Sequence, residues 1–400
     1  MSKNTFQTNR KPLGSVLHTS EPGSFARKSF QERYPRIIDD AIATNNYPTK
    51  IVSTIQALRD EIVQGTLQPL REDASDVALW NNEAREHLGK SWFNVPWFWA
   101  EAFFYRRFLE AVRYFQPGAF YRYDPFAPQK RRELESDSAP HTLDAVLAHL
   151  PSRIEDQFSV LMHSCLWGNR TDLSYLEIIG DSKTLALEHE RANLLVDDTT
   201  RVWEHIQLHR RRIDFICDNA GTELSFDLAL ADFLLRTDFA EQVVLNLKPQ
   251  PTFVSDAMIA DVHETLNAFS KSSTPSLQDL ATRLNHAMIE RRFVLSDHPF
   301  WITGFFFHDL PDDLRVSLAQ AYLVISKGDA NYRRIIGDCR WNTTLSFEKL
   351  AAHFPSSLVA LRTLKSDPIV GLEPGLAERL DVMDPTWHVN GKRGVIQFKK

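Results

Sequence analysis

From residue 212 onward, short apolar runs alternate with segments of helical periodicity, and this alternation limits the fold more than any other feature. The apolar runs cover residues 213–217, 242–248, 321–328 and 356–365. Helical patterns follow the first two runs, one ending near Thr237 and one covering residues 259–270. Parallel strands need helical crossovers, so the pattern predicts an α/β fold: a doubly wound, largely parallel sheet with helices on both faces.

The first half of the chain has mainly helical patterns. Apolar residues recur at helical spacing in Ile51, Ile55, Leu58 and Ile62, and further helices are predicted over residues 96–115, 154–166 and 199–209. We therefore expect a helical N-terminal region (residues 1–200) packed on an α/β domain (residues 201–400). Residues 116–142 are rich in Pro, Tyr and charge, and are expected to form a long surface segment.

Composition narrows the possible partners and location. The net charge of −6 and the pI near 6.2 argue against nucleic-acid and anionic-membrane partners. The most apolar long segment, residues 96–115, carries five charged residues and does not suit a membrane span. Three scattered cysteines suit no disulfide framework, and we see no apolar signal region near the N-terminus, so a cytoplasmic protein is expected. Two short basic runs, residues 130–132 and 210–212, are typical of solvated surfaces.

Polar residues gather where the predicted strands end, and ligands of such sheets bind at the carboxyl ends of the strands. These residues are Asp218, Asn219, Asp256, Lys327, Asp329, Asn331, Arg362 and Lys365. Oxygen ligands and anion-binding cations therefore converge at one predicted edge. A metal-assisted reaction on a phosphate ester needs this combination.

Asp218, Asn219 and Asp256 offer three oxygen ligands for Mg²⁺ or Mn²⁺, with waters completing the shell. The 38 residues from Asp218 to Asp256 have room for one helix and one strand, so a right-handed βαβ unit would bring the two strand ends together. The helix after Gly221 is expected to direct its N-terminus, with Glu223 in its first turn, toward a bound anion. Lys327 and Lys365 would neutralise phosphate oxygens.

Simpler interpretations exist for each motif taken alone. Asp218 or Asn219 could be a helix N-cap, the segment from Lys327 to Asp329 a plain turn with Gly328 at positive φ, and Lys365 a surface lysine. These simpler interpretations lose support when the motifs are considered together, because the polar strand ends share one edge of the predicted sheet. The motifs HExxH, GxGxxG, GxxxxGK[ST] and GxSxG are absent from the sequence.

Five motifs in order resemble the damage-control phosphatase family, also called acidic-residue methyltransferase-like. They are CLWGNRTDLS (165–174), DNAGTE (218–223), VSD (254–256), KGDANYR (327–333) and RTLK (362–365), and the pattern RTxK marks the third subfamily. Residues 24–39 and 92–107 also resemble the helical part of the family. The resemblance therefore covers nearly the whole chain.

The resemblance implies a metal-dependent phosphatase of sugar phosphates such as fructose 1-phosphate or fructose 6-phosphate. Asp218, Asn219 and Asp256 would bind Mn²⁺, Co²⁺, Ni²⁺ or Mg²⁺ and be the catalytic residues. The substrate would contact Asp218, Asn219, Glu223, Lys327, Gly328, Asp329, Ala330, Asn331 and Lys365, with Asn169 and Asp172 near the same cleft. Cys165 and the pair Ala257–Met258 depart mildly from the family pattern, and none of them is a presumed ligand.

Two other functions stay open at this point. A protein carboxyl methyltransferase would need an S-adenosylmethionine site, and the sequence shows no Gly-rich loop after a strand with a downstream acid for the ribose. A non-catalytic sugar-phosphate binding protein would keep the lysines but would not need Asp218, Asn219 and Asp256 together. For a phosphatase, Asp218 could orient the attacking water or form an aspartyl-phosphate. The oligomeric state is not determined by the sequence.

Overall fold

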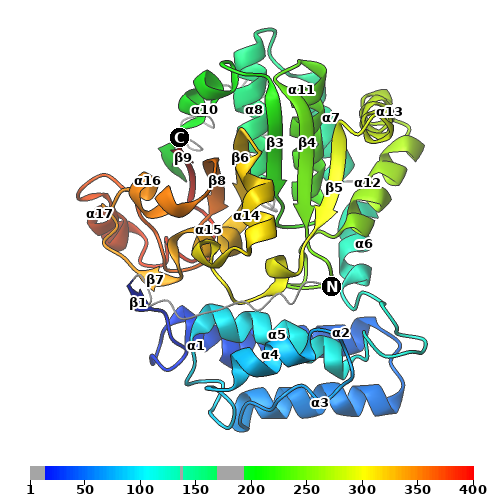
Figure 1. The fold of residues 1–400 in the computed structure, drawn as a ribbon, viewed down its shortest axis with the longest axis vertical. Helices are drawn as coiled ribbons and strands as arrows, with labels where there is room; N and C mark the ends of the chain where they lie inside the picture. The colour runs from blue at the N-terminus through cyan, green and yellow to red at the C-terminus, as the bar shows by residue number, and fades with distance from the viewer. Residues whose placement is uncertain (1–13, 136–137, 169–192) are drawn as a thin grey trace.

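A computed structural model describes residues 14–135, 138–168 and 193–400. Figure 1 shows two parts, a helical unit and an α/β domain, stacked along the long axis. The helical unit comprises α1 (Phe25–Lys28), the π-helical turn η1 (Ser29–Arg33), α2 (Tyr34–Thr44), α3 (Thr49–Gln64), α4 (Val77–Ala84) and α5 (Trp97–Ala111). The helices predicted around Ile51 and over residues 96–115 are confirmed as α3 and α5.

In the described part of the chain, seven strands form one sheet in the order β2-β9-β8-β6-β3-β4-β5. Their bounds are β2 (Leu194–Asp197), β3 (Arg211–Ile216), β4 (Ala240–Leu247), β5 (Phe293–Asp297), β6 (Leu323–Lys327), β8 (Ser357–Thr363) and β9 (Gly394–Lys399). The five strands from β8 to β5 in this order are mutually parallel. Strand β9 runs antiparallel to β8, and β2 runs parallel to β9. The predicted α/β class and largely parallel sheet are confirmed. A second, two-stranded sheet pairs β1 (Ser15–Val16) with β7 (Cys339–Arg340).

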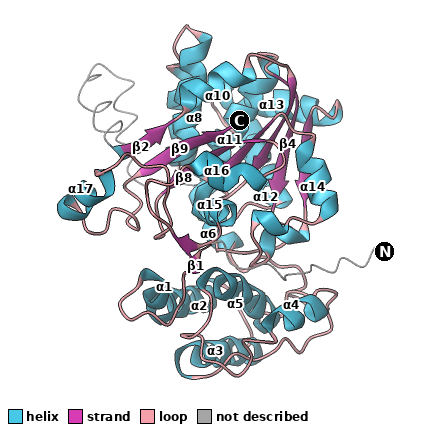
Figure 2. Cartoon of the chain, turned by 60° about the vertical axis from the view of Figure 1, so that its left-hand side comes forward, coloured by secondary structure: helices cyan, strands magenta, loops and turns pink. Residues whose placement is uncertain are grey.

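Helices cover both faces of the large sheet (Figure 2). One face packs against α7 (Ser138–Ala148), α8 (Ile154–Trp167), α10 (Thr199–Ile206), α11 (Thr222–Arg236), α12 (Ile259–Lys271) and α13 (Pro275–Ile289). The other packs against α14 (Asp312–Ala319), α15 (Gly328–Ile336), α16 (Phe347–Leu350), α17 (Leu376–Met383) and the short helices η3 (Pro299–Ile302), η4 (Phe307–Asp309) and η5 (Ala351–His353). Each face of the sheet has its own hydrophobic core. Successive residues of a strand point to opposite faces, so Phe215 and Cys217 pack in the core on the first face and Ile216 packs in the core on the other.

The helical unit has a core of its own, built largely from the aromatic side chains of α5 and its neighbours. Helices α7 and α8 and strand β2 precede the boundary expected at residue 200, yet they pack with the sheet. The expectation that residues 116–142 form only a surface segment is wrong, because this stretch contains α6 (Ala127–Glu135) and the start of α7. None of the described helices is long and apolar enough to cross a membrane.

Candidate active site

The polar residues that follow β3 and β4 meet at the carboxyl edge of the sheet. Asp218 and Asn219 come directly after β3, and Asp256 lies in the loop between β4 and α12. Backbone hydrogen bonds hold the two segments together, from Ala257 N to Asp218 O at 2.7 Å and from Ala220 N to Ser255 O at 2.7 Å. The backbone thus brings all three candidate metal ligands to one place.

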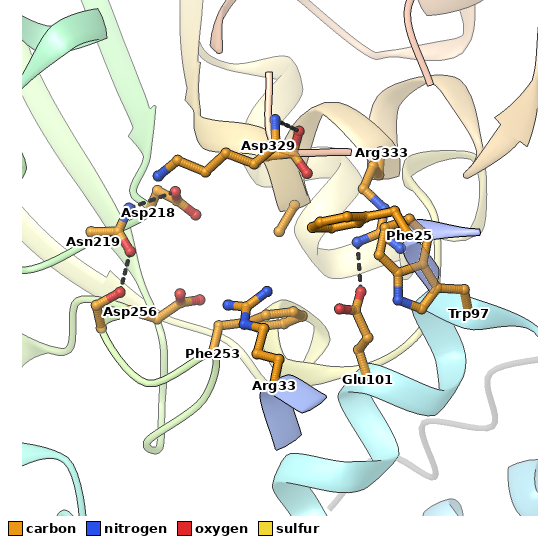
Figure 3. Close-up of a pocket in the computed structure, with 13 residues that line it drawn as sticks. Phe25, Arg33, Trp97, Glu101, Asp218, Asn219, Phe253, Asp256, Asp329 and Arg333 are labelled. Carbon is orange, nitrogen blue, oxygen red and sulfur yellow. Dashed lines mark hydrogen bonds and ion pairs between the residues drawn. The ribbon is translucent and has the colours of Figure 1, made fainter. Parts of the chain in front are cut away.

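These residues face a cavity of about 260 Å³ between the sheet edge and the helical unit (Figure 3). The α/β domain contributes Asp218, Asn219, Phe253, Ser255, Asp256, Asp329, Ala330, Arg333 and Lys365, and the helical unit contributes Phe25, Arg33, Trp97 and Glu101. Both parts of the protein therefore build this site.

The loop that carries Asp256 has an unusual backbone. Phe253 and Val254 both have positive φ, 48° and 71°, which is rare for residues with a side chain and rarest for a β-branched one. Phe253 packs against Tyr105 and Phe98 of α5, with ring centroids 5.1 and 6.3 Å apart. Contact with the helical unit therefore holds the turn that places Asp256.

Asn219 connects the carboxylates of the site. Its Nδ2 donates to Asp218 Oδ2 at 2.9 Å and to Glu223 Oε2 at 2.8 Å, while its Oδ1 accepts from Ser255 Oγ at 2.5 Å. Burial raises the pKa of Asp218 well above its usual value, and the nearby Glu223 and Asp256 raise it further. Burial also raises the pKa of Asp256, although the Lys248 ammonium opposes the shift.

Two buried lysines offset part of this negative charge. Lys327 Nζ lies 2.9 Å from Glu223 Oε1 and 2.8 Å from Asp227 Oδ1, and Lys248 Nζ lies 3.3 Å from Asp256 Oδ2. These two ammonium groups face four carboxylates, those of Asp218, Glu223, Asp227 and Asp256. The six groups sum to minus two when all are ionised, a charge that one divalent cation would balance.

The donor set fits a hard divalent metal. Asp256 Oδ2 is buried and lies 3.3 Å from the Lys248 ammonium, and the carboxylate keeps lone pairs that could bind a metal beside this contact. The Asp218 carboxylate and the Asn219 amide supply further oxygens beside it, as Mg²⁺ and Mn²⁺ prefer. No group of three or more His, Cys, Asp or Glu side chains suited to a metal occurs in the described ranges. Metal binding would therefore rest on two carboxylates and one amide, with water or substrate completing the shell.

The segment 327–331 does not contact the cavity as one unit. Asp329 and Ala330 line it, whereas Lys327 and Asn331 are fully buried behind it. Asn331 Nδ2 donates to the carbonyl oxygens of Lys327 and Cys217, which fastens the start of α15 to the end of β3. Gly328 has φ +80°, and a Cβ there would overlap the Asp218 carboxylate. Glycine at this position thus lets the N-terminus of α15 approach Asp218.

The two cations of the RTLK segment have different surroundings. Lys365 lines the cavity, and its ammonium contacts no described partner. Arg362 is buried and bound to Asp329 and to Ser366, so its predicted role as an anion binder is wrong. Its guanidinium also stacks on Tyr332, 4.3 Å from the ring centroid.

The N-terminus of α11 is occupied by a protein carboxylate. Thr222 N donates to Glu133 Oε1 of α6 at 3.0 Å, so the expectation that this helix end binds a substrate anion is wrong. Lys130, from the basic run expected to be solvated, is buried and lies 2.9 Å from both Asp256 O and Asp261 Oδ2. Helix α6 therefore supports the site on two sides.

Some predicted residues lie away from the cavity, and some residues of the site were not predicted. Asn169 and Asp172 lie outside the described residues. Glu223 is buried beside Asn219 and does not line the cavity. Lys248 was overlooked, although it directly follows β4 at the edge where the strand-end argument applies. Arg33 and Glu101 had no signal in the strand pattern, since they come from the helical unit.

Comparisons with known proteins identify the family and agree with the fold. The family model of the damage-control phosphatase ARMT1-like domain matches residues 29–380. Damage-control phosphatase ARMT1 of Danio rerio is 33% identical, covering 94% of this chain and 95% of that protein, and the Bos taurus protein of this name is 32% identical over 96% and 98%.

The human protein of the same name is 29% identical over 96% of this chain and 98% of its own length. A DUF89 family protein from Pyrococcus horikoshii has a similar fold, with a TM-score of 0.50, 15% identity and coverage of 94% and 98%. The family model and these relatives, each covered over nearly its whole length, show that the chain belongs to the ARMT1-like damage-control phosphatase family and is a phosphatase, a hydrolase.

Proposed function

We propose that this protein hydrolyses phosphate monoesters of small sugars, of the fructose 1-phosphate or fructose 6-phosphate type, with a divalent metal held by Asp218, Asn219 and Asp256. The observation that carries the proposal is one small cavity with excess buried carboxylate charge at the metal-binding end and unpaired cationic side chains elsewhere in its wall. Its volume of about 260 Å³ lies below the range of roughly 300 to 1,000 Å³ typical of drug-sized ligands, which favours a small metabolite.

The bound metal, Mn²⁺, Co²⁺, Ni²⁺ or Mg²⁺, would polarise the phosphoryl group and offset its developing charge. The protein groups have separate tasks. Lys365 extends its ammonium into the cavity, and the N-terminal turn of α15 at Asp329 and Ala330 presents backbone N–H groups to an anion. The rings of Phe25 and Trp97 close the cavity on the side of the helical unit and would pack against the sugar.

Asp218 is the candidate for the bond-making step. Its carboxylate lies at the carboxyl end of β3, beside Asp256 and the α15 N-terminus. It would orient a water for in-line attack or attack the phosphorus itself, with an aspartyl-phosphate then hydrolysed by water. Acid quenching of a single turnover separates the two routes, because only the covalent route leaves a phosphoryl group bound to the Asp218 carboxylate.

The methyltransferase alternative is not favoured, since the family and the relatives are named for phosphatase activity. A protein that only binds sugar phosphates would not need Asp218, Asn219 and Asp256 together. A cytoplasmic location is part of this proposal: Cys165, Cys217 and Cys339 are all unpaired and buried, as expected in a reducing compartment.

The test is phosphate release from a panel of sugar phosphates by metal-stripped protein, with and without each divalent metal. We expect no release after stripping and recovery with Mn²⁺ or Co²⁺. Asp256→Asn should lose metal binding and activity together, while Asp60→Asn, at an exposed position on α3, serves as the matched control. Full activity of the stripped protein, or of Asp256→Asn, would rule the proposal out.

A further inference from the structure

Arg33 stands out among the cationic side chains of the cavity wall. Arg333 also lines the cavity, but it is paired with Glu101 at 2.5 Å and with Asp338 at 2.6 Å. The guanidinium of Arg33 forms no hydrogen bond or ion pair with any residue that the structure describes, and its side chain is exposed to the cavity. Only the Lys365 ammonium shares this situation among the described cations that line the cavity.

The local backbone holds Arg33 in place. It is the last residue of the π-helical turn η1, and single π-helical turns occur frequently at functional sites. The next residue, Tyr34, is fully buried, donates to Glu101 Oε1 at 2.5 Å and packs on Phe104 at 4.4 Å. Figure 3 shows the Arg33 side chain reaching from the helical unit into the space between Asp256 and Glu101. The backbone position from which the Arg33 side chain reaches the cavity is therefore set before any ligand binds.

Charge indicates what Arg33 would contact. The carboxylates of Glu101 and Asp329 act on the Arg33 guanidinium electrostatically, but neither forms an ion pair with it, and a neutral sugar supplies no charge to balance it. A phosphate monoester dianion does, and its oxygens match the two parallel N–H groups of an arginine fork. Arg33 and Lys365 together carry the two positive charges that such a dianion needs.

We infer that Arg33 is a substrate-binding residue that grips the phosphoryl group from the helical unit, while Lys365 and the N-terminus of α15 hold it from the α/β domain. The identity of the substrate as a phosphate monoester rests on the proposed function. The helical unit then does more than stabilise the sheet edge: it completes the phosphate site, and specificity for the dianion depends on both parts of the chain.

The test uses the full-length, Mn²⁺-loaded protein and inorganic phosphate as the probe. Isothermal titration should show phosphate affinity at least tenfold weaker in Arg33→Met than in the native protein, with Mn²⁺ affinity and thermal unfolding unchanged. The value of kcat/KM should fall by about a hundredfold to a thousandfold, as for loss of one transition-state donor, and by a similar factor for every monoester in the panel. Arg33→Lys should recover part of both losses, since it keeps the charge but not the fork.

Arg36→Met is the matched control, because Arg36 lies one turn away on α2, is exposed and does not line the cavity. It should bind phosphate like the native protein. Unchanged phosphate affinity in Arg33→Met, or no phosphate binding by the native protein, would overturn the inference. A loss confined to one sugar would overturn it as well, because Arg33 would then contact the alcohol. If the native protein hydrolyses no monoester but its phosphate binding depends on Arg33, the inference stands and the proposed function fails.

Discussion

The Asp329 carboxylate accepts a hydrogen bond from Arg362 Nε at 2.8 Å, which joins the KGD segment at the start of α15 to the RTLK segment at the end of β8. The same oxygen, Oδ1, accepts from Lys365 N at 3.2 Å. Burial alone would raise the pKa of Asp329, but the guanidinium groups of Arg362 and Arg333 lower it below the usual value. Asp329 is therefore ionised, and it fixes the loop from which Lys365 reaches the cavity.

The Arg362→Lys variant tests this relationship. A lysine keeps the charge but cannot reproduce the bonds of Arg362 to Asp329, Ser366 and the backbone. We expect a loss of about 1 to 3 kcal/mol in unfolding free energy. We also expect kcat/KM to fall through displacement of Lys365, while Mn²⁺ affinity stays the same. Urea unfolding, kinetics and metal titration measure these three quantities, and unchanged kcat/KM in a destabilised variant would show that Arg362 does not position Lys365.

Lys365→Met tests the cation at the cavity directly. The methionine keeps much of the apolar stem, so stability should change little. Removing a donor that stabilises the transition state costs about 3 kcal/mol of barrier, or roughly a hundredfold in kcat/KM. Metal content should be unaffected, because lysine is not expected to be a ligand. The control Lys349→Met, at an exposed position on α16, should be fully active; equal kcat/KM in the two variants would make Lys365 a bystander.

Lys327→Met should act mainly on stability. Its ammonium is completely buried between Glu223 and Asp227, and removing it leaves two carboxylates without their partner. Breaking such a buried pair costs about 3 to 5 kcal/mol, measurable by urea unfolding. The double variant Lys327→Met, Asp227→Asn should recover part of the loss, because one uncompensated charge is gone. Native stability with a selective loss of substrate affinity would instead make Lys327 a direct phosphate contact.

The stability of the metal-free protein should depend on pH through the buried carboxyl groups. Burial raises the pKa of both Asp218 and Asp256, so the folded protein keeps protons that the unfolded chain, with a carboxyl pKa of about 3.9, has released. The contribution of these groups to stability is therefore present at low pH and is lost as pH rises from about 4 through the raised pKa values. Mn²⁺ replaces the protons, so its stabilising effect should grow with pH.

Comparison with Asp256→Asn isolates this effect. Other buried groups act in the opposite direction, such as His353, whose pKa burial lowers to about 4. The unfolding free energy of the metal-free native protein, relative to Asp256→Asn, should fall as pH rises from about 4, the carboxyl pKa of the unfolded chain, toward neutrality. A difference that stays constant or grows over this range would contradict the raised pKa of Asp256.

The fold class, and the edge of the sheet where the candidate site lies, were predictable from the sequence alone. The apolar runs now seen as β3, β4, β6 and β8 were recognisable because parallel strands buried on both faces are continuously apolar. Asp218, Asn219 and Asp256 were recognisable because polar residues at the ends of such strands have no packing role. Strands β2, β5 and β9 were not predicted: β2 and β9 form the side of the sheet where the strand direction reverses, and β2 and β5 are only partly buried.

Which charged residues face the cavity depends on how the segments pack in three dimensions. Lys327, Arg362 and Lys365 have the same charge and lie at or just beyond the carboxyl ends of β6 and β8, yet two are paired with carboxylates and one is free to meet a ligand. Arg33 reaches the site from nearly two hundred residues upstream of Asp218, by packing of the helical unit on the sheet edge. Strand ends follow from periodicity within a segment, whereas the partner of a charge depends on which segments fold against each other, and spacing along the chain does not encode that choice.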